Sequence, residues 1–278
     1  MPTASRIYYA QSNEGNKDQP PVILIHGAGS SHLIWPAAIR RLNGQRVIAL
    51  DLPGHGRSSG VAQQSISAYA DLVFEFLAEL GLFQAVFVGH SMGGAIALEL
   101  AHRYPTHVAG LGLISTGAYL GIDPKFLENL STPVTIPSAL LTFQTRAFSP
   151  QTSHVLVERC MQTLKETRPA VLYGDWHACA AFDLRESIGQ IQAPTWVING
   201  SEDQVTPISY ANFLADRIPA ARLQMIPGAG HMALLEYPER VAQGLQQFLA
   251  ALGAARAAVS RVHMPSTAPL PAYQRKNA

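Results

Sequence analysis

The sequence has few charged residues and little net charge, and both shortages exclude classes of protein. Charged residues make up 14% of the 278 residues, against about 25% in a typical soluble protein. Hydrophobic residues make up 47% and the formal net charge is +1. This composition excludes intrinsic disorder of the whole chain, because disorder needs low hydrophobicity and high net charge. Without a basic stripe, we expect neither nucleic acid nor an anionic membrane as a partner.

Cysteines and long apolar runs are also scarce. Cys160 and Cys179 can pair, but we expect two buried thiols rather than a secreted disulfide framework. Clustered metal-ligand spacing is missing, so no metal and no cofactor are predicted. No apolar segment reaches the roughly 18 residues of a membrane span, and residues 1–15 lack the pattern of a signal peptide. We therefore expect a cytoplasmic protein, and nothing indicates its oligomeric state.

Short apolar runs bounded by Gly, Pro or Asp predict the strands. Their nearly continuous hydrophobicity is typical of a parallel sheet that helices cover on both faces. Helical periodicity lies between them at Ser67–Leu80, Met92–Arg103 and Glu239–Leu252. This alternation predicts a doubly wound α/β sheet. The predicted strands are Val22–Ile25, Arg46–Leu50, Ala85–Val88, Leu111–Ile114, Thr195–Ile198 and Leu223–Ile226.

The stretch 117–190 interrupts the alternation. It has no clear strand, and its prolines separate short helical patterns that are rich in aromatic residues. We interpret it as a helical cap inserted into a core formed by residues 1–116 and 191–253. The alternative is an irregular run of ordinary crossover helices. Residues 254–278 are small, polar and contain proline, which predicts a flexible tail.

A candidate nucleophile lies in Gly89-His90-Ser91-Met92-Gly93. This G-x-S-x-G motif directly follows the predicted strand Ala85–Val88 and opens a predicted helix. That setting is typical of a nucleophile elbow, a turn so tight that flanking side chains would clash, which accounts for the glycines. The alternative is that Ser91 merely caps the helix.

A serine nucleophile needs a base, and the base needs an orienting carboxylate. In the nucleophile-elbow arrangement the acid and then the histidine follow the serine in the chain. Asp203 follows the strand Thr195–Ile198, and His231 follows the strand Leu223–Ile226. All three residues therefore lie beyond the carboxyl ends of strands, where sites form in open α/β sheets. Glu202 is the alternative acid. The other histidines are interpreted as structural: His26, His55, His90, His102, His107, His154 and His177.

Acyl transfer also needs N–H donors for a developing oxyanion. The loop His26-Gly27-Ala28-Gly29, here called the oxyanion loop, follows the first predicted strand and offers the N–H of Ala28. The N–H of Met92 is the second predicted donor. The alternative is a phosphate-binding loop, but the G-x-x-x-x-G-K-[ST] pattern of such loops is absent from this sequence. Six aromatic residues can line an apolar substrate pocket or form the core around it: Trp35, Tyr119, Phe143, Phe148, Tyr173 and Trp176.

Together with Asp51-Leu-Pro-Gly-His-Gly-Arg-Ser58, these motifs resemble those of the α/β-hydrolase superfamily, over about Val22 to Leu249. The resemblance implies a mostly parallel eight-stranded sheet, a helical cap after the sixth strand, and Ser–His–Asp hydrolysis through an acyl-enzyme. A serine at position 91 argues against the similar dehalogenase and epoxide hydrolase branches, which carry an aspartate there.

The resemblance leaves the substrate open. We expect a carboxylesterase-like serine hydrolase that acts on a small-to-medium, uncharged, apolar ester. A lactonase, a carbon–carbon bond hydrolase and a cofactor-free perhydrolase or haloperoxidase use the same triad and stay as alternatives. A ligand-binding protein without activity is a further alternative.

Overall fold

The computed structural model describes residues 3–16 and 18–262. An eight-stranded sheet has the order β1-β2-β4-β3-β5-β6-β7-β8. The pairs β1–β2 and β2–β4 are antiparallel, and all other pairs are parallel. The predicted fold class is therefore confirmed. The strands are β1 (Thr3–Ala4), β2 (Ile7–Ser12), β3 (Val22–Ile25), β4 (Val47–Leu50), β5 (Ala85–His90), β6 (Val108–Ile114), β7 (Thr195–Gly200) and β8 (Ala221–Ile226).

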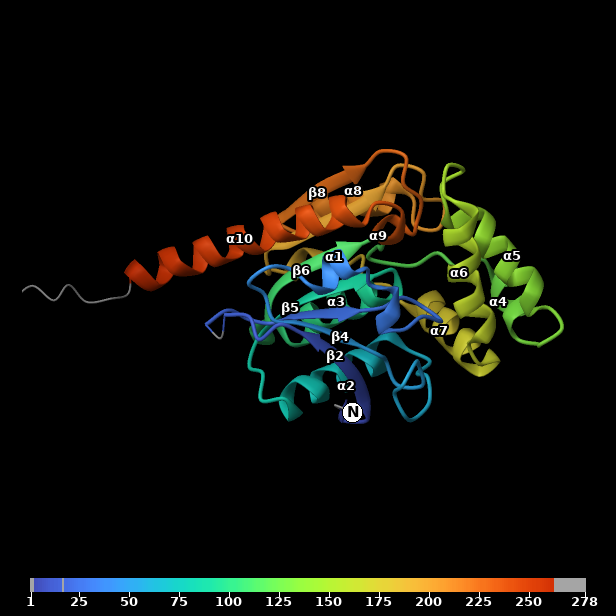
Figure 1. Cartoon of the computed structure of the whole chain (residues 1–278), viewed down its shortest axis with the longest axis horizontal. Coiled ribbons are helices and arrows are strands. Elements are labelled where there is room, and N and C mark those ends of the chain that lie inside the picture. Colours follow the sequence, from blue (N-terminus) through green and yellow to red (C-terminus); the bar gives the residue numbers. More distant parts are fainter. Residues whose placement is uncertain (1–2, 17, 263–278) are drawn as a thin grey trace, which may run out of the picture.

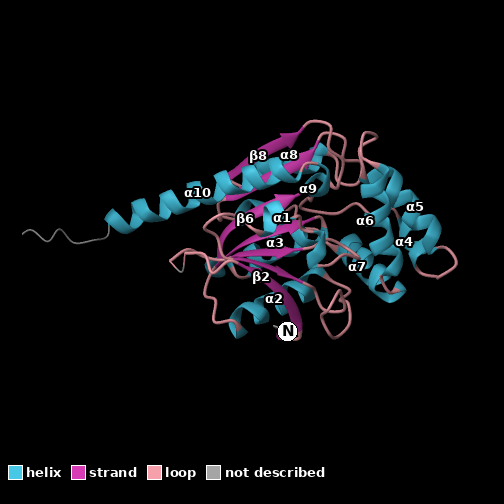
Figure 2. Cartoon of the chain, in the orientation of Figure 1, coloured by secondary structure: helices cyan, strands magenta, loops and turns pink. Residues whose placement is uncertain are grey.

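Helices cover both faces of the sheet (Figure 2). Helices α2, α3 and α8 pack on one face, and α1, α9 and α10 pack on the other. The helices are α1 (Ala37–Arg40), α2 (Ile66–Glu79), α3 (Met92–Arg103), α4 (Pro124–Leu130), α5 (Ile136–Ala147), α6 (His154–Glu166), α7 (Pro169–Ala181), α8 (Ile208–Arg217), α9 (Ala233–Glu236) and α10 (Pro238–Val262), with 3-10 turns η1 (His32–Ile34), η2 (Pro105–His107) and η3 (Ile188–Gln190).

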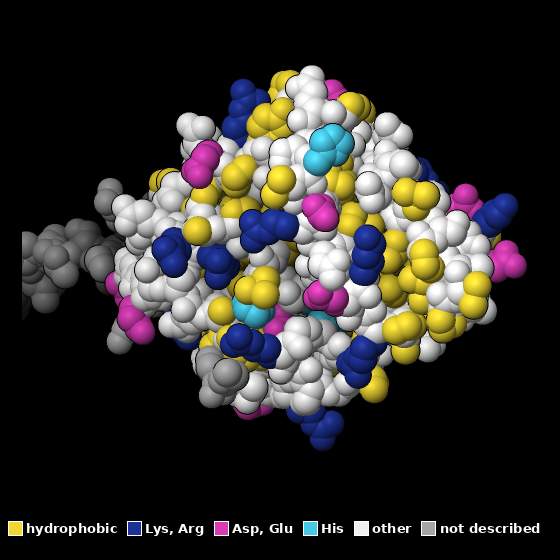
Figure 3. Space-filling model, turned by 45° about the vertical axis from the view of Figure 1, so that its right-hand side comes forward, with side chains coloured by type: hydrophobic (Ala, Val, Ile, Leu, Met, Phe, Trp, Pro, Cys, Tyr) yellow, Lys and Arg dark blue, Asp and Glu magenta, His cyan; other side chains and the backbone are white. Residues whose placement is uncertain are grey.

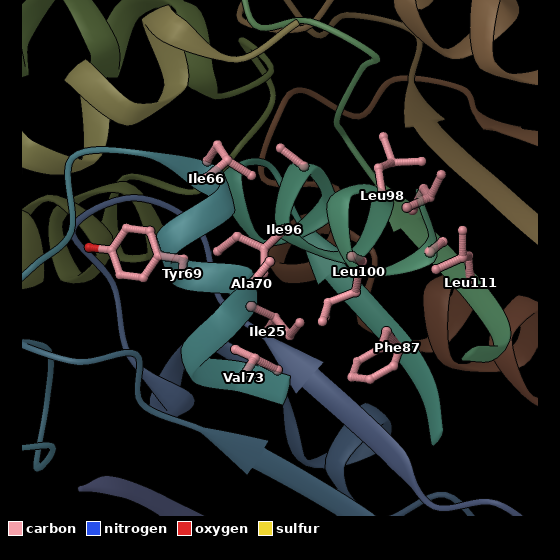
Figure 4. Close-up of a cluster of buried hydrophobic side chains, with 14 of the residues drawn as sticks. Ile25, Ile66, Tyr69, Ala70, Val73, Phe87, Ile96, Leu98, Leu100 and Leu111 are labelled. Atoms are coloured by element: carbon pink, nitrogen blue, oxygen red, sulfur yellow. The ribbon is translucent and has the colours of Figure 1, made fainter. Parts of the chain in front are cut away.

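The core explains why the central strands are apolar throughout. Every residue of β3, β4 and β5 is buried, because successive side chains enter opposite layers. Ile23 and Ile25 pack with α2 and α3, whereas Val22 and Leu24 pack toward α1 and α10. Figure 4 shows the first layer, in which strand and helix side chains interdigitate: Ile25, Ile66, Tyr69, Ala70, Val73, Phe87, Ile96, Leu98, Leu100 and Leu111.

The parallel register brings the functional loops to one edge of the sheet. Gly89 of β5 pairs with Ile25 of β3 on one side and with Leu113 of β6 on the other. The oxyanion loop and Ser91 therefore leave the sheet side by side. Helices α4–α7 lie between β6 and β7 in the chain and gather at this end of the molecule (Figure 1). This arrangement is consistent with the predicted cap, and helices α4–α7 with the loops between them are called the cap below.

The C-terminal helix differs from the expectation. Helix α10 continues to Val262, so the predicted boundary at residue 253 falls inside a helix that projects from the body (Figure 1). Ala and Gly dominate beyond Leu252, so the amphipathic spacing that predicts a helix is weak there. The sequence therefore predicts a helix that ends too early. The rest of the predicted tail, 263–278, lies outside the described residues. Among the described helices, none is long and apolar enough to cross a membrane.

Candidate active site

The turn between β5 and α3 holds Ser91 in a strained conformation. Its φ is +53° and its ψ is −118°, a region that residues other than glycine rarely adopt. A Cβ on Gly89 would lie 2.0 Å from the carbonyl oxygen of Gly93, and a Cβ on Gly93 would lie 2.1 Å from that of Ile25. Neither position can carry a side chain. The Ser91 side chain makes no capping hydrogen bond to α3, so the alternative of a helix cap is wrong.

The structure brings Ser91, His231 and Asp203 together from the ends of β5, β8 and β7. The Oγ of Ser91 lies 3.0 Å from Nε2 of His231, and Nδ1 of His231 lies 3.0 Å from Oδ2 of Asp203. With the Nδ1 proton donated to Asp203, Nε2 can accept the serine proton. The rival acid, Glu202, instead accepts a hydrogen bond from the Ser149 hydroxyl at 2.8 Å. The geometry is that of a nucleophile, a base and an orienting carboxylate, and their catalytic roles stay a prediction.

Asp203 is held as a carboxylate by the loop that carries it. Its Oδ1 accepts hydrogen bonds from the N–H groups of Val205 and Thr206, both at 2.8 Å. Its Oδ2 accepts a further bond from the Thr206 hydroxyl at 2.8 Å. Burial raises the pKa of Asp203, but the charge of His231 and these hydrogen bonds outweigh burial and lower the pKa below its ordinary value. The group beside His231 is therefore ionised at neutral pH.

The two predicted oxyanion donors lie on either side of Ser91. Met92 begins α3 directly after it, and Ala28 lines the cavity in front of it. Within the described part of the chain, neither the Ala28 N–H nor the Met92 N–H has a hydrogen-bond acceptor. Two unpaired donors beside a nucleophile are what a tetrahedral oxyanion requires, so both assignments stay predictions with compatible geometry.

A narrow cavity of about 60 Å³ opens onto Ser91 and His231. Its walls come from the oxyanion loop, the cap helices and the loops after β6, β7 and β8. No Lys, Arg, Asp or Glu of the described chain lines it. The apolar side chains that form most of its wall are Ile34, Leu120, Ile122, Phe143, Leu164, Trp176, Val205 and Met232.

Two of the six predicted aromatic residues line this cavity. Phe143 and Trp176 face each other with ring centroids 5.7 Å apart, and the Phe143 ring lies 6.2 Å from the ring of His231 at nearly a right angle. Phe143 therefore lies beside the base, and Trp176 continues the same cavity wall.

The other four aromatic residues lie elsewhere, which corrects their assignment. Trp35 is completely buried on the α1–α10 face of the sheet, and Phe148 is buried in the core of the cap. Tyr119 packs against the ring of Tyr210, and Tyr173 against His177. Their hydrophobicity serves packing rather than the cavity wall.

Sequence reasoning missed several wall residues because they are ordinary aliphatic or sulfur-containing side chains. Leu164 and Cys160 lie on α6, and Met232 directly follows the base. Met232 could have been found from its position beside His231, but nothing in the helical pattern separates Leu164 from a residue of the cap core. Cys160 and Cys179 are free and buried, as predicted.

Two of the remaining histidines are buried beside the site as neutral rings. Burial and the neighbouring charge of His231 lower the pKa of His90 to about 3. Burial and the charge of His55 lower the pKa of His26 to about 4. The Nδ1 of His26 donates to the Gly27 carbonyl at 2.8 Å, and its Nε2 accepts from the Leu52 N–H at 3.0 Å. Both rings are buried, which is compatible with the predicted structural role, although His90 also borders the cavity.

A metal ion in a protein is held by a group of ligand side chains that lie close together. Among residues 3–16 and 18–262, no group of three His, Cys, Asp or Glu side chains is arranged to hold a metal ion.

On the face shown in Figure 3, acidic and basic side chains are interspersed with hydrophobic ones.

Comparison with known proteins agrees with the fold. The family model described as "alpha/beta hydrolase fold" matches residues 20–238. A pimeloyl-[acyl-carrier protein] methyl ester esterase of Aromatoleum aromaticum is 29% identical over 80% of this chain and 95% of its own length. A solved structure of a thermophilic esterase is 31% identical, with a TM-score of 0.76, over 88% of this chain and 99% of that one.

A longer relative matches only in part. The dihydrolipoyllysine-residue acetyltransferase component of the acetoin cleaving system of Pseudomonas putida is 30% identical over 84% of this chain. The chain spans 65% of the length of that relative.

Proposed function

The chain belongs to the α/β-hydrolase family, and from that premise we propose that it is a serine carboxylesterase with Ser91 as nucleophile, His231 as base and Asp203 as orienting acid. The observation that carries the proposal is the continuous relay of two 3.0 Å contacts from Ser91 Oγ through His231 to Asp203. It lies at the floor of an apolar cavity. The esterases among its relatives support the same reaction class.

The reaction follows from the positions of these groups. His231 Nε2 takes the hydroxyl proton while Ser91 Oγ bonds to the carbonyl carbon of the ester, and the carbonyl π electrons move to the oxygen. The N–H groups of Ala28 and Met92 hold this oxyanion. When the tetrahedral intermediate collapses, the C–O bond to the alcohol breaks and His231 returns its proton to the leaving oxygen. Water, deprotonated by His231, then cleaves the acyl-enzyme, and Asp203 stabilises the imidazolium in both steps.

The cavity supports a short, uncharged acyl group. A single water-sized group needs roughly 10–15 Å³ of cavity, so about 60 Å³ suits a short chain better than a long one. A wall without cations offers no partner to a phosphate or a carboxylate, and burying such a charge unpaired is costly. The proposed substrate class is therefore small, apolar carboxylic esters.

The test uses purified protein and p-nitrophenyl esters of graded acyl length, with lactones in the same panel. Ser91→Ala should abolish turnover and labelling by a fluorophosphonate, while its thermal melt stays close to that of the wild type. If the protein turns over lactones but not linear esters, the proposed substrate class is wrong and lactones take its place.

The acid is tested with a matched pair of neighbours. Asp203→Asn should lower kcat by about 10³–10⁴-fold, because the asparagine favours the wrong tautomer of His231. Glu202→Gln should retain most of the activity, because Glu202 bonds Ser149 instead. Retained activity in Ser91→Ala, or equal losses in the two acid variants, would refute the assignment.

A further inference from the structure

A carboxylate from the cap is buried against the oxyanion loop. Asp175 lies on α7 and is 0% exposed. Its Oδ2 accepts a hydrogen bond from the Gly29 N–H at 2.7 Å and lies 2.7 Å from Nε2 of His55, and its Oδ1 accepts a bond from the Tyr69 hydroxyl at 2.6 Å. A buried charge is costly unless its hydrogen bonds are satisfied. All three partners lie outside the cap, in two loops and on α2, so Asp175 connects the cap to the core.

His55 contacts Asp175 through one ring nitrogen and a backbone carbonyl through the other. Its Nε2 faces Asp175, and its Nδ1 lies 3.1 Å from the carbonyl oxygen of Pro53, so both ring nitrogens face acceptors. Burial lowers the pKa of His55, but the charge of Asp175 and the hydrogen bonds outweigh burial and raise it above its ordinary value. The two acceptors and the raised pKa both favour the protonated ring of His55, which lies beside Asp175 at the oxyanion loop.

The cap holds Gly29 from a second side. The Oγ1 of Thr167, at the end of α6, lies 2.8 Å from the carbonyl oxygen of Gly29 and 2.9 Å from that of Thr163. Gly29 has a φ of +65°, and a Cβ there would lie 2.7 Å from Leu172 and 2.8 Å from Leu164. The N–H and the carbonyl of one residue are thus both bonded by cap side chains, and the residue is pressed against two cap helices.

Gly29 directly follows Ala28, the proposed oxyanion donor, so fixing both peptides of Gly29 restricts the backbone of Ala28, whose N–H lies in the preceding peptide. A donor acts on an oxyanion only at about 2.7–3.1 Å, which leaves little tolerance for loop movement. We propose that Asp175 is a positioning residue, which holds the oxyanion loop from the cap so that the Ala28 N–H is directed at the oxyanion. This inference rests on the proposed function, because it assigns a support to one of that site's donors.

The two carboxylate oxygens of Asp175 have different partners, so two variants can test their bonds separately. Asp175→Asn removes the charge and leaves at most a neutral amide oxygen to accept from the Gly29 N–H, so it weakens that bond. Tyr69→Phe removes a bond to the other oxygen and leaves the bond to Gly29 in place. We expect Asp175→Asn to lower kcat for p-nitrophenyl acetate at least about tenfold with KM within about threefold. Removing an oxyanion donor outright costs about 10²–10³ in kcat. Tyr69→Phe should lower the melting temperature but keep kcat within about threefold of the wild type.

Hydrogen exchange of the oxyanion loop gives a readout that does not depend on activity. The amides of this loop should exchange faster in Asp175→Asn than in Tyr69→Phe. If the two variants keep the same kcat and the same loop exchange, Asp175 only stabilises the fold and the inference is overturned. A wild-type protein that hydrolyses no ester refutes the proposed function instead, and the exchange experiment still shows whether Asp175 holds the loop.

If Asp175→Asn does not fold, variants of Thr167 test whether the cap anchors the oxyanion loop. Thr167→Val removes the hydroxyl that reaches Gly29, and Thr167→Ser keeps it. A fall in kcat of about threefold or more in Thr167→Val that Thr167→Ser restores supports anchoring of the loop by the cap. Wild-type kcat in both variants overturns it.

Discussion

The hydroxyl of Thr206 lies 2.8 Å from Oδ2 of Asp203 and 3.1 Å from Nδ1 of His231. Thr206 therefore contacts both partners of the acid–base pair through one atom. Its own N–H also donates to Oδ1 of Asp203, so this single residue binds both carboxylate oxygens. Thr206 is therefore placed to orient Asp203 relative to His231.

Removing the Thr206 hydroxyl should weaken the hydrogen bonding of the Asp203–His231 pair without displacing either residue. Thr206→Val keeps the volume and the backbone N–H but removes one hydrogen bond to a charged oxygen, which is worth about 1.5–3 kcal/mol. We expect kcat/KM for a short ester to fall roughly tenfold if most of that energy is felt in the transition state. Thr206→Ser should retain most of the activity. Equal activity of all three proteins would show that Thr206 is not needed to orient the pair.

The glycine after the nucleophile gives a prediction about folding. A Cβ on Gly93 would lie 2.1 Å from the backbone carbonyl oxygen of Ile25 in β3, and a backbone atom in the middle of the sheet cannot move aside cheaply. Gly93→Ala should therefore unfold the protein or lower its stability by more than about 3 kcal/mol, as overpacking of a rigid site does. Urea denaturation followed by circular dichroism measures the loss.

Gly189 is the matched control for this change. Its added Cβ would meet only the Arg217 carbonyl oxygen at 3.5 Å, an ordinary contact, and its φ is not positive. Gly189→Ala should leave stability within about 1 kcal/mol of the wild type or raise it slightly. A mild effect of Gly93→Ala, comparable to that of Gly189→Ala, would contradict the close packing of the elbow against β3.

The central strands and the three triad candidates could be predicted because their signals are local. Val22–Ile25 is apolar at every position because both of its faces are covered, and Asp203 and His231 each follow such a run. Strands β1 and β2 gave no such signal. They pair antiparallel at the sheet edge, where β2 is partly exposed and mixes polar with apolar residues.

The cavity wall could not be predicted because it depends on how four short helices pack. Phe143 and Phe148 are both aromatic residues near the end of α5, yet one faces the cavity and the other the cap core. Hydrophobicity alone does not distinguish these two surroundings. Asp175 was missed for a related reason: its partners Gly29, His55 and Tyr69 come from distant segments, and a lone acid on a helix is typical of a solvated surface.

These two phenylalanines provide a test of the cavity. Phe143→Ala should enlarge the space beside His231 and raise the ratio of kcat/KM for an octanoate over an acetate ester about tenfold. A longer chain can then bury several more CH₂ groups, each worth about 0.8 kcal/mol, part of which is lost to reorganisation. Phe148→Ala should lower stability by about 3 kcal/mol or more without changing that ratio. A similar change of preference in both variants would show that general loosening of the cap, rather than the wall, sets acyl-chain length.

The buried histidine beside the nucleophile predicts how stability changes with pH. Burial lowers the pKa of His90 from 6.5 to about 3 in the folded protein. Below pH 6.5 the unfolded chain therefore binds a proton that the folded protein does not, so the free energy of unfolding falls as the pH falls toward 3. Between pH 7.5 and pH 5 this loss is about 2 kcal/mol for one such histidine.

Replacing His90 by a side chain that does not titrate isolates this contribution. The Nε2 of His90 donates to the His231 carbonyl at 3.1 Å, and glutamine can keep a donor there. His90→Gln should be less stable than the wild type at pH 7.5, because the glutamine fits the buried site less well. By pH 5 the gap should narrow by about 2 kcal/mol, because only the wild type then carries the histidine penalty. Urea unfolding of both proteins at the two pH values measures the gap, and a gap that stays constant would mean that His90 takes up its proton equally in the folded and unfolded chains.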